Sequence, residues 1–214
     1  MECMIFVDFD GTITLQDTCD AMMDCYGNQA WREIDQKWAE GKISTQEAAR
    51  AIFQHIRIRE EEVRAFARTI GIDTGFIPFV AFCHTMKWPV TILSDGYDIF
   101  ISTILEQHGL SHIPYYSNQM IFNGDRLDIR CPYYHPDYPW QGVAKARIMR
   151  DAVKDKRKAV FIGDGLSDIY AAEVADILFA KGALEGYCRE NALSFYPFDT
   201  FKDVERTIRE IAGK

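Results

Sequence analysis

Near its start the chain reads Cys3-Met4-Ile5-Phe6-Val7-Asp8-Phe9-Asp10-Gly11-Thr12, a short apolar run that ends in two carboxylates and a glycine. A continuous apolar run of this length is typical of a strand buried on both faces, as in a parallel sheet. Because an extended backbone places residues i and i+2 on the same side, we expect Asp8 and Asp10 to reach one cleft. The sequence therefore predicts a strand over Cys3–Phe9 with a functional site at its carboxyl end, where open α/β sheets bind their ligands.

Strands and helices are predicted to alternate along most of the remaining chain. Further apolar runs predict strands at Pro89–Leu93, Ala159–Ile162 and Asp176–Ala180. Helical patterns cover Asp98–His108, Val143–Val153 and Ser167–Ala175. This alternation predicts the α/β class, with a Rossmann-like parallel sheet core whose crossovers are right-handed.

The region after the first strand differs, because it is rich in helix formers and has no strand-like run. Ser44 followed by Glu47 is a capping-box pattern that predicts a helix start, and Ile58–Ile70 has the pattern of a charged, amphipathic helix. A helical block inserted after the first strand of an α/β sheet suggests a cap or lid. We therefore predict a helical cap over residues 14–77, inserted into an α/β catalytic core of residues 1–13 and 78–214.

A second interruption of the alternating pattern spans residues 112–140. Gln119–Phe122 and Arg126–Ile129 flank Asn123-Gly124, a pair that favours a tight type I′ turn, so a hairpin is expected here. The Pro- and Tyr-rich loop Cys131–Trp140 follows it. Its aromatic side chains suit either a pocket for an apolar or cationic group or the packing of a stiff surface loop.

The composition is that of a globular protein of 214 residues, nearly half of them hydrophobic. A formal net charge of −8 argues against nucleic-acid binding, which normally needs a clustered basic face, but leaves room for a small anionic substrate. No apolar run approaches the roughly 20 residues that span a bilayer, so no membrane partner is expected. The six cysteines contain no Cys-x-x-Cys pair, so we expect them to be reduced thiols in a cytoplasmic protein. The protein is expected to be a monomer or a homodimer.

Asp8 and Asp10 have the chemistry that cleavage of a phosphate ester requires. That reaction needs a nucleophile, an acid for the leaving oxygen, and cations that neutralise the phosphoryl oxygens. Two clustered carboxylates form a hard-oxygen site suited to Mg²⁺. Gly11 permits an unusual backbone, and the Thr12 hydroxyl and nearby amides can hold phosphate oxygens. The alternative is an acidic turn that caps the next helix, which suits a bare Asp-x-Asp better than this longer string.

Three later motifs lie where strands are predicted to end or helices to begin. Ser94 is predicted to end the second strand, where its hydroxyl can bind a phosphoryl oxygen, and Lys145 opens a helix with an ammonium group for the phosphate. Gly163-Asp164-Gly165-Leu166-Ser167-Asp168 follows the third strand and offers two carboxylates that can complete a metal site. Each motif taken singly has an ordinary structural alternative. Ser94 suits a generic strand end, Lys145 a solvated surface lysine, and the string from Gly163 to Asp168 the capped start of a helix.

The ordered set Asp-x-Asp-Gly-Thr, Ser, Lys and Gly-Asp-Gly-x-x-Asp resembles the haloacid dehalogenase superfamily of phosphotransferases. The helical insert after the first motif is similar to the subclass that has its cap at that place. The resemblance covers essentially the whole chain. It implies a Mg²⁺-dependent phosphatase that acts on a small phosphomonoester.

The resemblance also implies a role for each motif residue. Asp8 would be the nucleophile that forms an aspartyl phosphate, and Asp10 the acid and then the base of the hydrolysis. Mg²⁺ would be held by the Asp8 and Asp164 carboxylates and by the Asp10 backbone carbonyl, while Asp168 would orient Lys145 or a metal-bound water. The phosphate-binding set would be Thr12, Ser94, Asp95 and Lys145, with support from Gly11, Gly163, Ser167 and Asp168.

The cap is expected to select the substrate. Asp17 stands where phosphoserine phosphatases commonly carry a substrate-facing glutamate, but the position of their carboxylate-binding arginine corresponds to Ile52. Asp8–Thr14 and Asp17 resemble the methionine-salvage phosphatases, and Ser94-Asp95 resembles the phosphoethanolamine and phosphocholine phosphatases. We favour the methionine-salvage type, with phosphoserine phosphatase and phosphotransfer to an alcohol as the alternatives.

A receiver-like regulatory domain is an alternative of another class, because it also combines clustered aspartates, Mg²⁺ and a lysine on an α/β fold. Its phospho-accepting aspartate ends a mid-chain strand, whereas Asp8 is predicted to end the first strand. The helical insert also has no place in that fold.

Overall fold

The computed structural model describes residues 1–27, 31–54, 56–153 and 157–213. The chain divides into two compact units. Unit 1 comprises Met1–Leu15, Ile72–Leu93 and Lys145–Lys214, and unit 2 comprises Gln16–Gly71 and Ser94–Ala144. Within the described ranges, no helix combines the length and the apolar character needed to cross a bilayer.

Unit 1 is built on a parallel sheet. Its strands are β1 (Cys3–Val7), the first part of β2 (Val90–Tyr97), β5 (Lys158–Gly163), β6 (Ile177–Ala180) and β7 (Tyr196–Pro197). Their order is β2-β1-β5-β6-β7, and each neighbouring pair is parallel. Strands β1 and β5 are buried over nearly their whole length, as expected for strands covered on both faces. The predicted α/β class with a parallel sheet core is confirmed.

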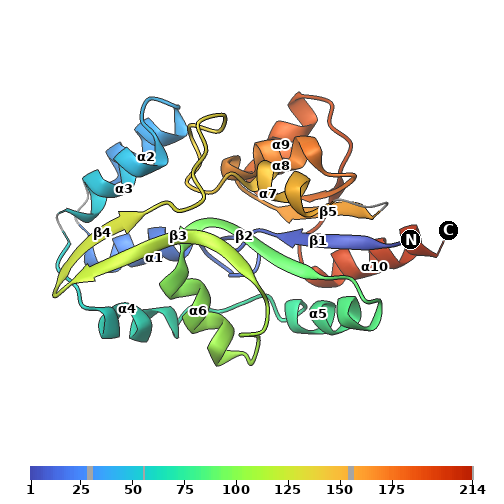
Figure 1. Cartoon of the computed structure of the whole chain (residues 1–214), viewed down its shortest axis with the longest axis horizontal. Helices are drawn as coiled ribbons and strands as arrows, with labels where there is room; N and C mark the ends of the chain where they lie inside the picture. Colours follow the sequence, from blue (N-terminus) through green and yellow to red (C-terminus); the bar gives the residue numbers. More distant parts are fainter. Residues whose placement is uncertain (28–30, 55, 154–156, 214) are drawn as a thin grey trace. The chain divides into compact units, whose positions relative to one another are not determined.

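Helices cover both faces of this sheet (Figure 1). On one side lie α7 (Lys145–Ala152), α8 (Ile169–Val174) and α9 (Gly182–Glu190), and on the other lies α5 (Phe76–Thr85). Helix α10 (Phe201–Ala212) packs against α5 through the Phe201 ring, which contacts the rings of Phe76 and Phe79. The predicted helices Val143–Val153 and Ser167–Ala175 correspond to α7 and to the short 3-10 turn η1 (Leu166–Asp168) followed by α8.

The register of the unit 1 sheet brings two acidic segments to one edge. Strands β1 and β5 pair with Val7 opposite Ile162. The N–H of Asp8 extends this ladder by donating to the Ile162 carbonyl at 2.9 Å. Because the strands are parallel, the residues that follow them emerge at the same edge, with Asp8 after β1 and Asp164 after β5.

Unit 2 combines helices with an antiparallel hairpin. Its elements are α1 (Thr18–Tyr26), α2 (Trp31–Ala39), α3 (Thr45–Phe53), α4 (Glu60–Ala67), the end of β2, α6 (Asp98–Gln107), β3 (Tyr115–Asn123) and β4 (Arg126–Arg130). The predicted hairpin and the capping box of α3, formed by Ser44 with Glu47, are confirmed. The predicted turn pair Asn123-Gly124 is wrong by one residue: Asn123 pairs with Arg126 as the last residue of β3, so the turn is Gly124-Asp125, and of these two only Gly124 has a positive φ. Unit 2 also includes Ser94–Ala144, so the division into a cap of residues 14–77 and a separate core stays a prediction.

Strand β2 is longer than predicted. The apolar run predicted a strand over Pro89–Leu93, whereas β2 continues through Ser94 to Tyr97. Aspartate and glycine are poor strand formers, so local propensity hides this extension. Burial of Tyr97, whose ring packs edge-on against the Phe53 ring at 5.2 Å between centroids, favours it. Ser94 therefore lies within β2 and not at its end, which corrects the predicted boundary.

A buried carboxylate joins the starts of α5 and α10. Asp73 is 6% exposed. Its two oxygens accept the N–H of Gly75 at 2.6 Å and the N–H of Phe201 at 3.0 Å. Amide groups at a helix start have no partner within the helix, so Asp73 satisfies one such group at each of two helices that are far apart in the sequence.

We expect Asp73→Ala to lower the free energy of unfolding by about 2–4 kcal/mol, because the substitution leaves two buried N–H groups without a partner. Asp73→Asn keeps an acceptor oxygen for one of these groups and should lose about half as much. Urea-induced unfolding followed by circular dichroism measures both changes. If Asp73→Ala lost no more stability than Asp151→Ala, a substitution of an exposed carboxylate, the role of Asp73 would be wrong.

Candidate active site

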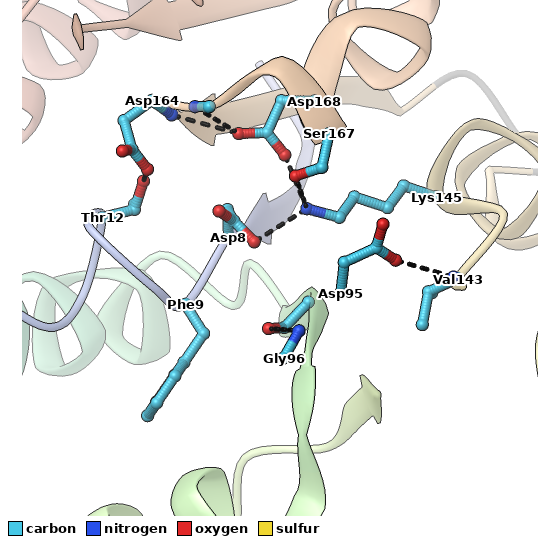
Figure 2. Close-up of polar contacts among 12 residues, drawn as sticks. Asp8, Phe9, Thr12, Asp95, Gly96, Val143, Lys145, Asp164, Ser167 and Asp168 are labelled. Carbon is cyan, nitrogen blue, oxygen red and sulfur yellow. Dashed lines mark hydrogen bonds and ion pairs between the residues drawn. The ribbon is translucent and has the colours of Figure 1, made fainter. Parts of the chain in front are cut away.

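The centre of the site is a buried lysine. Lys145 begins α7 and its side chain is fully buried. Its Nζ donates to Asp8 Oδ1 at 2.8 Å, to Asp168 Oδ1 at 2.6 Å and to Ser167 Oγ at 3.3 Å (Figure 2). An ammonium group has three N–H bonds, and these three acceptors match them. The predicted residues Asp8, Lys145, Ser167 and Asp168 are therefore brought together, and Lys145 is not a surface lysine.

Asp168 is held in place by the turn that follows β5. Its Oδ2 accepts the N–H of Asp164 and the N–H of Gly165, both at 3.1 Å. A Cβ on Gly163 would clash with this carboxylate, so only glycine leaves the space for it. With Oδ2 fixed by the backbone and Oδ1 bonded to Lys145, Asp168 orients the ammonium group.

The loop after β1 approaches the loop after β5 through Gly11 and Thr12. The Thr12 hydroxyl donates to Asp164 Oδ1 at 2.6 Å (Figure 2). Gly11 has a φ of +71°, a conformation that favours glycine, and a Cβ at this position would clash with the Asp164 carboxylate. The predicted supporting role of Gly11 thus has a geometric basis in the close approach of the two loops.

The site carries more negative than positive charge. Oxygen atoms of Asp8, Asp164 and Asp168 lie within 4.8 Å of one another, and Lys145 is the ammonium that bonds to two of these carboxylates. Burial, with Asp168 as the next cause, raises the pKa of Asp8 well above its ordinary value and the pKa of Asp164 to about 6. A divalent cation would relieve this repulsion, and hard carboxylate oxygens suit Mg²⁺.

The hydrogen bonds single out two of the three carboxylates as candidate metal ligands. Both oxygens of Asp168 already accept bonds from Lys145 or the backbone. Asp8 and Asp164 each have one oxygen bonded to a side chain, namely to Lys145 and to Thr12. The residues therefore fit a cation held by Asp8 and Asp164, in keeping with the predicted set, whereas Asp168 serves the lysine.

Ser94 and Asp95 belong to unit 2 and have bonds of their own there. Ser94 is fully buried, and its Oγ accepts the N–H of Gly96 at 2.9 Å. Asp95 Oδ1 accepts the N–H of Val143 at 2.7 Å (Figure 2), and the Asp95 carbonyl accepts Asn118 Nδ2 at 2.6 Å. Asp95 thus anchors the end of the loop that precedes α7, and the phosphate-binding role expected for Ser94 and Asp95 stays a prediction.

Two other predicted residues lie in the segment between β1 and α1. Asp10 is half-buried in the turn after β1, and its proton-transfer and metal-binding roles stay predictions. Asp17 is the N-cap of α1, where its side chain accepts the N–H of Asp20 at 2.8 Å. N-cap aspartates commonly accept a bond of this kind. A substrate-facing role for Asp17 also stays a prediction.

The turn between β6 and α9 also holds Asp164, and the sequence did not reveal it. The Leu184 N–H, in the first turn of α9, donates to the Asp164 carbonyl at 2.9 Å. Gly182 has a φ of +55°, and a Cβ there would press on the same carbonyl. The positive charge of Lys181 opposes the rise in the pKa of Asp164. A lysine-glycine pair directly after the fourth predicted strand was the available signal.

The chain is similar to known phosphatases over its whole length. Residues 5–173 match the haloacid dehalogenase-like hydrolase family. The chain is 32% identical to a 2-hydroxy-3-keto-5-methylthiopentenyl-1-phosphate phosphatase of Lysinibacillus sphaericus, over 99% of this chain and 96% of that protein. It is 29% identical to the phosphatase of the same name from Brevibacillus brevis, over 97% of this chain and 96% of that protein.

The fold is also that of solved phosphatase structures. A substrate-bound phosphoserine phosphatase complex superposes with a TM-score of 0.75 at 19% sequence identity, covering 97% of this chain and 98% of that one. At this identity the likeness concerns the fold alone. It agrees with the α/β fold predicted from the sequence.

Proposed function

We propose that this chain, which belongs to the haloacid dehalogenase-like hydrolase family and is a phosphatase, uses Asp8 to attack the phosphorus of a small phosphomonoester. The proposal rests above all on the contact between Asp8 and the buried Lys145. The Lys145 ammonium has no exposure to water, is bonded to the strand-end carboxylate of Asp8 and is oriented by the carboxylate of Asp168. Burial of charged groups in this way costs free energy. Such arrangements cluster at functional sites, where charged substrates bind.

In the proposed reaction, the two oxygens of Asp8 have different duties. The Lys145 bond to Oδ1 at 2.8 Å fixes the carboxylate, so that one oxygen attacks phosphorus while the other stays available to the proposed cation. The new bond forms an aspartyl phosphate, and the bond from phosphorus to the alcohol oxygen of the substrate breaks. Lys145 then stabilises negative charge on the phosphoryl oxygens, because its ammonium already lies beside the nucleophile.

We assign the proton transfers to Asp10. It lies two residues after the nucleophile, in the turn at the end of β1. In the first step its carboxylic acid gives a proton to the leaving alcohol oxygen. In the second step the resulting carboxylate takes a proton from the water that attacks the aspartyl phosphate, which releases phosphate and restores both residues.

The proposed cofactor is Mg²⁺, held by carboxylate oxygens of Asp8 and Asp164 and by the Asp10 backbone carbonyl. When bound, it would supply positive charge to the phosphoryl oxygens. The Thr12 hydroxyl fixes one Asp164 oxygen at 2.6 Å, and the backbone around Gly182 fixes the Asp164 carbonyl. These bonds hold the carboxylate in one orientation before any ligand arrives.

For the substrate we propose 2-hydroxy-3-keto-5-methylthiopentenyl-1-phosphate, the compound in the name of the full-length relatives. Phosphoserine is the alternative, because several solved structures of similar fold are phosphoserine phosphatases. Two observations favour the first: the relatives named for it are more similar in sequence, and Ile52 stands where a carboxylate-binding arginine is expected for phosphoserine. Ser94 and Asp95 remain proposed phosphate ligands.

Several finer points of function stay predictions. These are the cytoplasmic location, the monomeric or homodimeric state, and the choice of water over an alcohol as acceptor. The receiver-like alternative is not retained, because the chain belongs to a hydrolase family that matches residues 5–173.

We expect Mg²⁺ to raise the melting temperature by about 5–10 °C at a hundredfold excess over its Kd, as mass action predicts for a ligand of the folded state. Asp164→Asn should remove most of this shift, since it replaces a charged ligand with a neutral one. Asp151→Asn, which changes an exposed carboxylate of α7, should keep it. Differential scanning fluorimetry with and without EDTA measures the shift, and an unchanged shift in Asp164→Asn would contradict the proposed ligand.

Asp8→Asn should lower kcat for an aryl phosphate by about 10⁴-fold or more, because the amide is a far weaker nucleophile. Circular dichroism spectra of both proteins should coincide, since the amide keeps the size and the oxygen acceptor for Lys145. Asp151→Asn again serves as the control. A turnover of Asp8→Asn close to that of the wild type would rule out Asp8 as the nucleophile.

A screen of phosphomonoesters tests the substrate. We expect kcat/KM to be highest for 2-hydroxy-3-keto-5-methylthiopentenyl-1-phosphate, and at least about tenfold lower for phosphoserine, whose carboxylate would lack a bidentate arginine. Phosphocholine and phosphoethanolamine complete the comparison. Highest kcat/KM for phosphoserine would overturn the proposed substrate while leaving the phosphatase chemistry intact.

A further inference from the structure

The Thr14 hydroxyl closes the loop that carries the proposed nucleophile. Thr14 follows the aspartate motif and is 1% exposed. Its Oγ1 donates to the Phe9 carbonyl at 3.2 Å and accepts the N–H of Gly11, also at 3.2 Å. The Thr14 N–H donates to the same Phe9 carbonyl at 3.0 Å. One side chain therefore links the start and the middle of the turn that follows β1.

Gly11, which Thr14 holds, is the residue that lies against Asp164. Its positive φ and its lack of a Cβ permit this approach, as described above for the loop after β1. The next residue, Thr12, donates to Asp164 Oδ1. A rotation of the Gly11 peptide would therefore move both the backbone beside Asp164 and the hydroxyl that orients it.

Thr14 is also fixed from its other side, within unit 1. It forms an antiparallel bridge with Ile72. The N–H of Asp73 donates to the Ile13 carbonyl at 2.9 Å, and Asp73 in turn holds the starts of α5 and α10. The segment that carries Thr14 is thus anchored to a buried part of unit 1, which makes its hydroxyl a fixed reference point for the loop.

We propose that Thr14 is a positioning residue, which sets the Gly11 peptide through its hydroxyl and thereby the distance between the nucleophile loop and the carboxylate of Asp164. The inference rests on the proposed function, because it assumes that Asp8 and Asp164 act together on one substrate and one cation. It assigns to the hydroxyl a role that packing alone cannot fill. Valine has nearly the same shape but leaves the half-buried Gly11 N–H without its acceptor.

The test compares Thr14→Val, which removes the hydroxyl, with Thr14→Ser, which keeps it and removes a methyl group. A matched control is Thr85→Val, at an exposed threonine of α5 whose hydroxyl donates to the Ala81 carbonyl of its own helix. Three readouts are needed: the Kd for Mg²⁺ alone by isothermal titration calorimetry, kcat and KM for an aryl phosphate, and hydrogen–deuterium exchange of a peptide that covers Gly11.

We expect Thr14→Val to weaken Mg²⁺ binding about fivefold and to lower kcat about tenfold with KM within a factor of two, since the loop is misplaced for the reaction and not for substrate binding. Exchange at Gly11 should accelerate while exchange in β5 stays unchanged. Thr14→Ser should restore all three values to within about a factor of two of the wild type. Thr85→Val should match the wild type throughout.

Two results would overturn the inference. One is a Thr14→Val protein whose Mg²⁺ affinity and kcat match the wild type. The other is a Thr14→Ser protein as defective as Thr14→Val, which would show that the methyl packing matters and not the hydroxyl. If Thr14→Val fails to fold, Thr14→Ser together with Gly11 exchange in the wild type still decides, because rapid exchange at Gly11 would contradict the bond to Thr14. Failure of the proposed function is distinct, since the wild type itself would then lack phosphatase activity.

Discussion

Burial of one ammonium group constrains the whole site. Lys145 has no exposure to water, and a lone buried charge of this kind would cost several kcal/mol or change its protonation. The structure compensates it with Asp8 from the end of β1 and Asp168 from the turn after β5. These contacts require β1 and β5 to end at the same level, which their parallel register ensures. The sheet, the turn and helix α7 therefore have to form together for the lysine to be buried.

The carboxylates that compensate the lysine leave the site with a surplus of negative charge, and that surplus favours the binding of a cation. Two carboxylates would suffice for one ammonium, yet Asp164 lies beside them. Burial, and after it the charge of Asp168, raises the pKa of Asp164 to about 6. Glycines at positions 11 and 163 keep the carboxylates close, because a side chain at either place would push them apart. The electrostatic repulsion among these carboxylates favours the binding of a cation, whose charge can in turn attract an anionic phosphate group.

The sequence predicted the parts of this arrangement that follow from local pattern. Apolar runs ending in Asp8 and Asp164 gave the strands and the edge at which both residues lie, since parallel strands leave little choice. It could not show that Lys145 is buried, because a lysine that opens a helix looks like surface from its neighbours alone. It also missed α10, whose apolar residues are explained by packing against α5, and the end of β2 at Tyr97, where burial overrides weak strand propensity.

The division of the chain separates the residues proposed to carry out the reaction from those proposed to select the substrate. Unit 1 contains the proposed nucleophile, its lysine and the carboxylates of the proposed metal site, and each is fixed by bonds within that unit. Unit 2 contains the residues proposed to select the substrate, Asp17 among them. Substitutions in unit 2 can therefore change the substrate without disturbing the buried charges. A change at Thr14 is different, because its hydroxyl bonds to the loop of the nucleophile, and it should alter the reaction for every substrate alike.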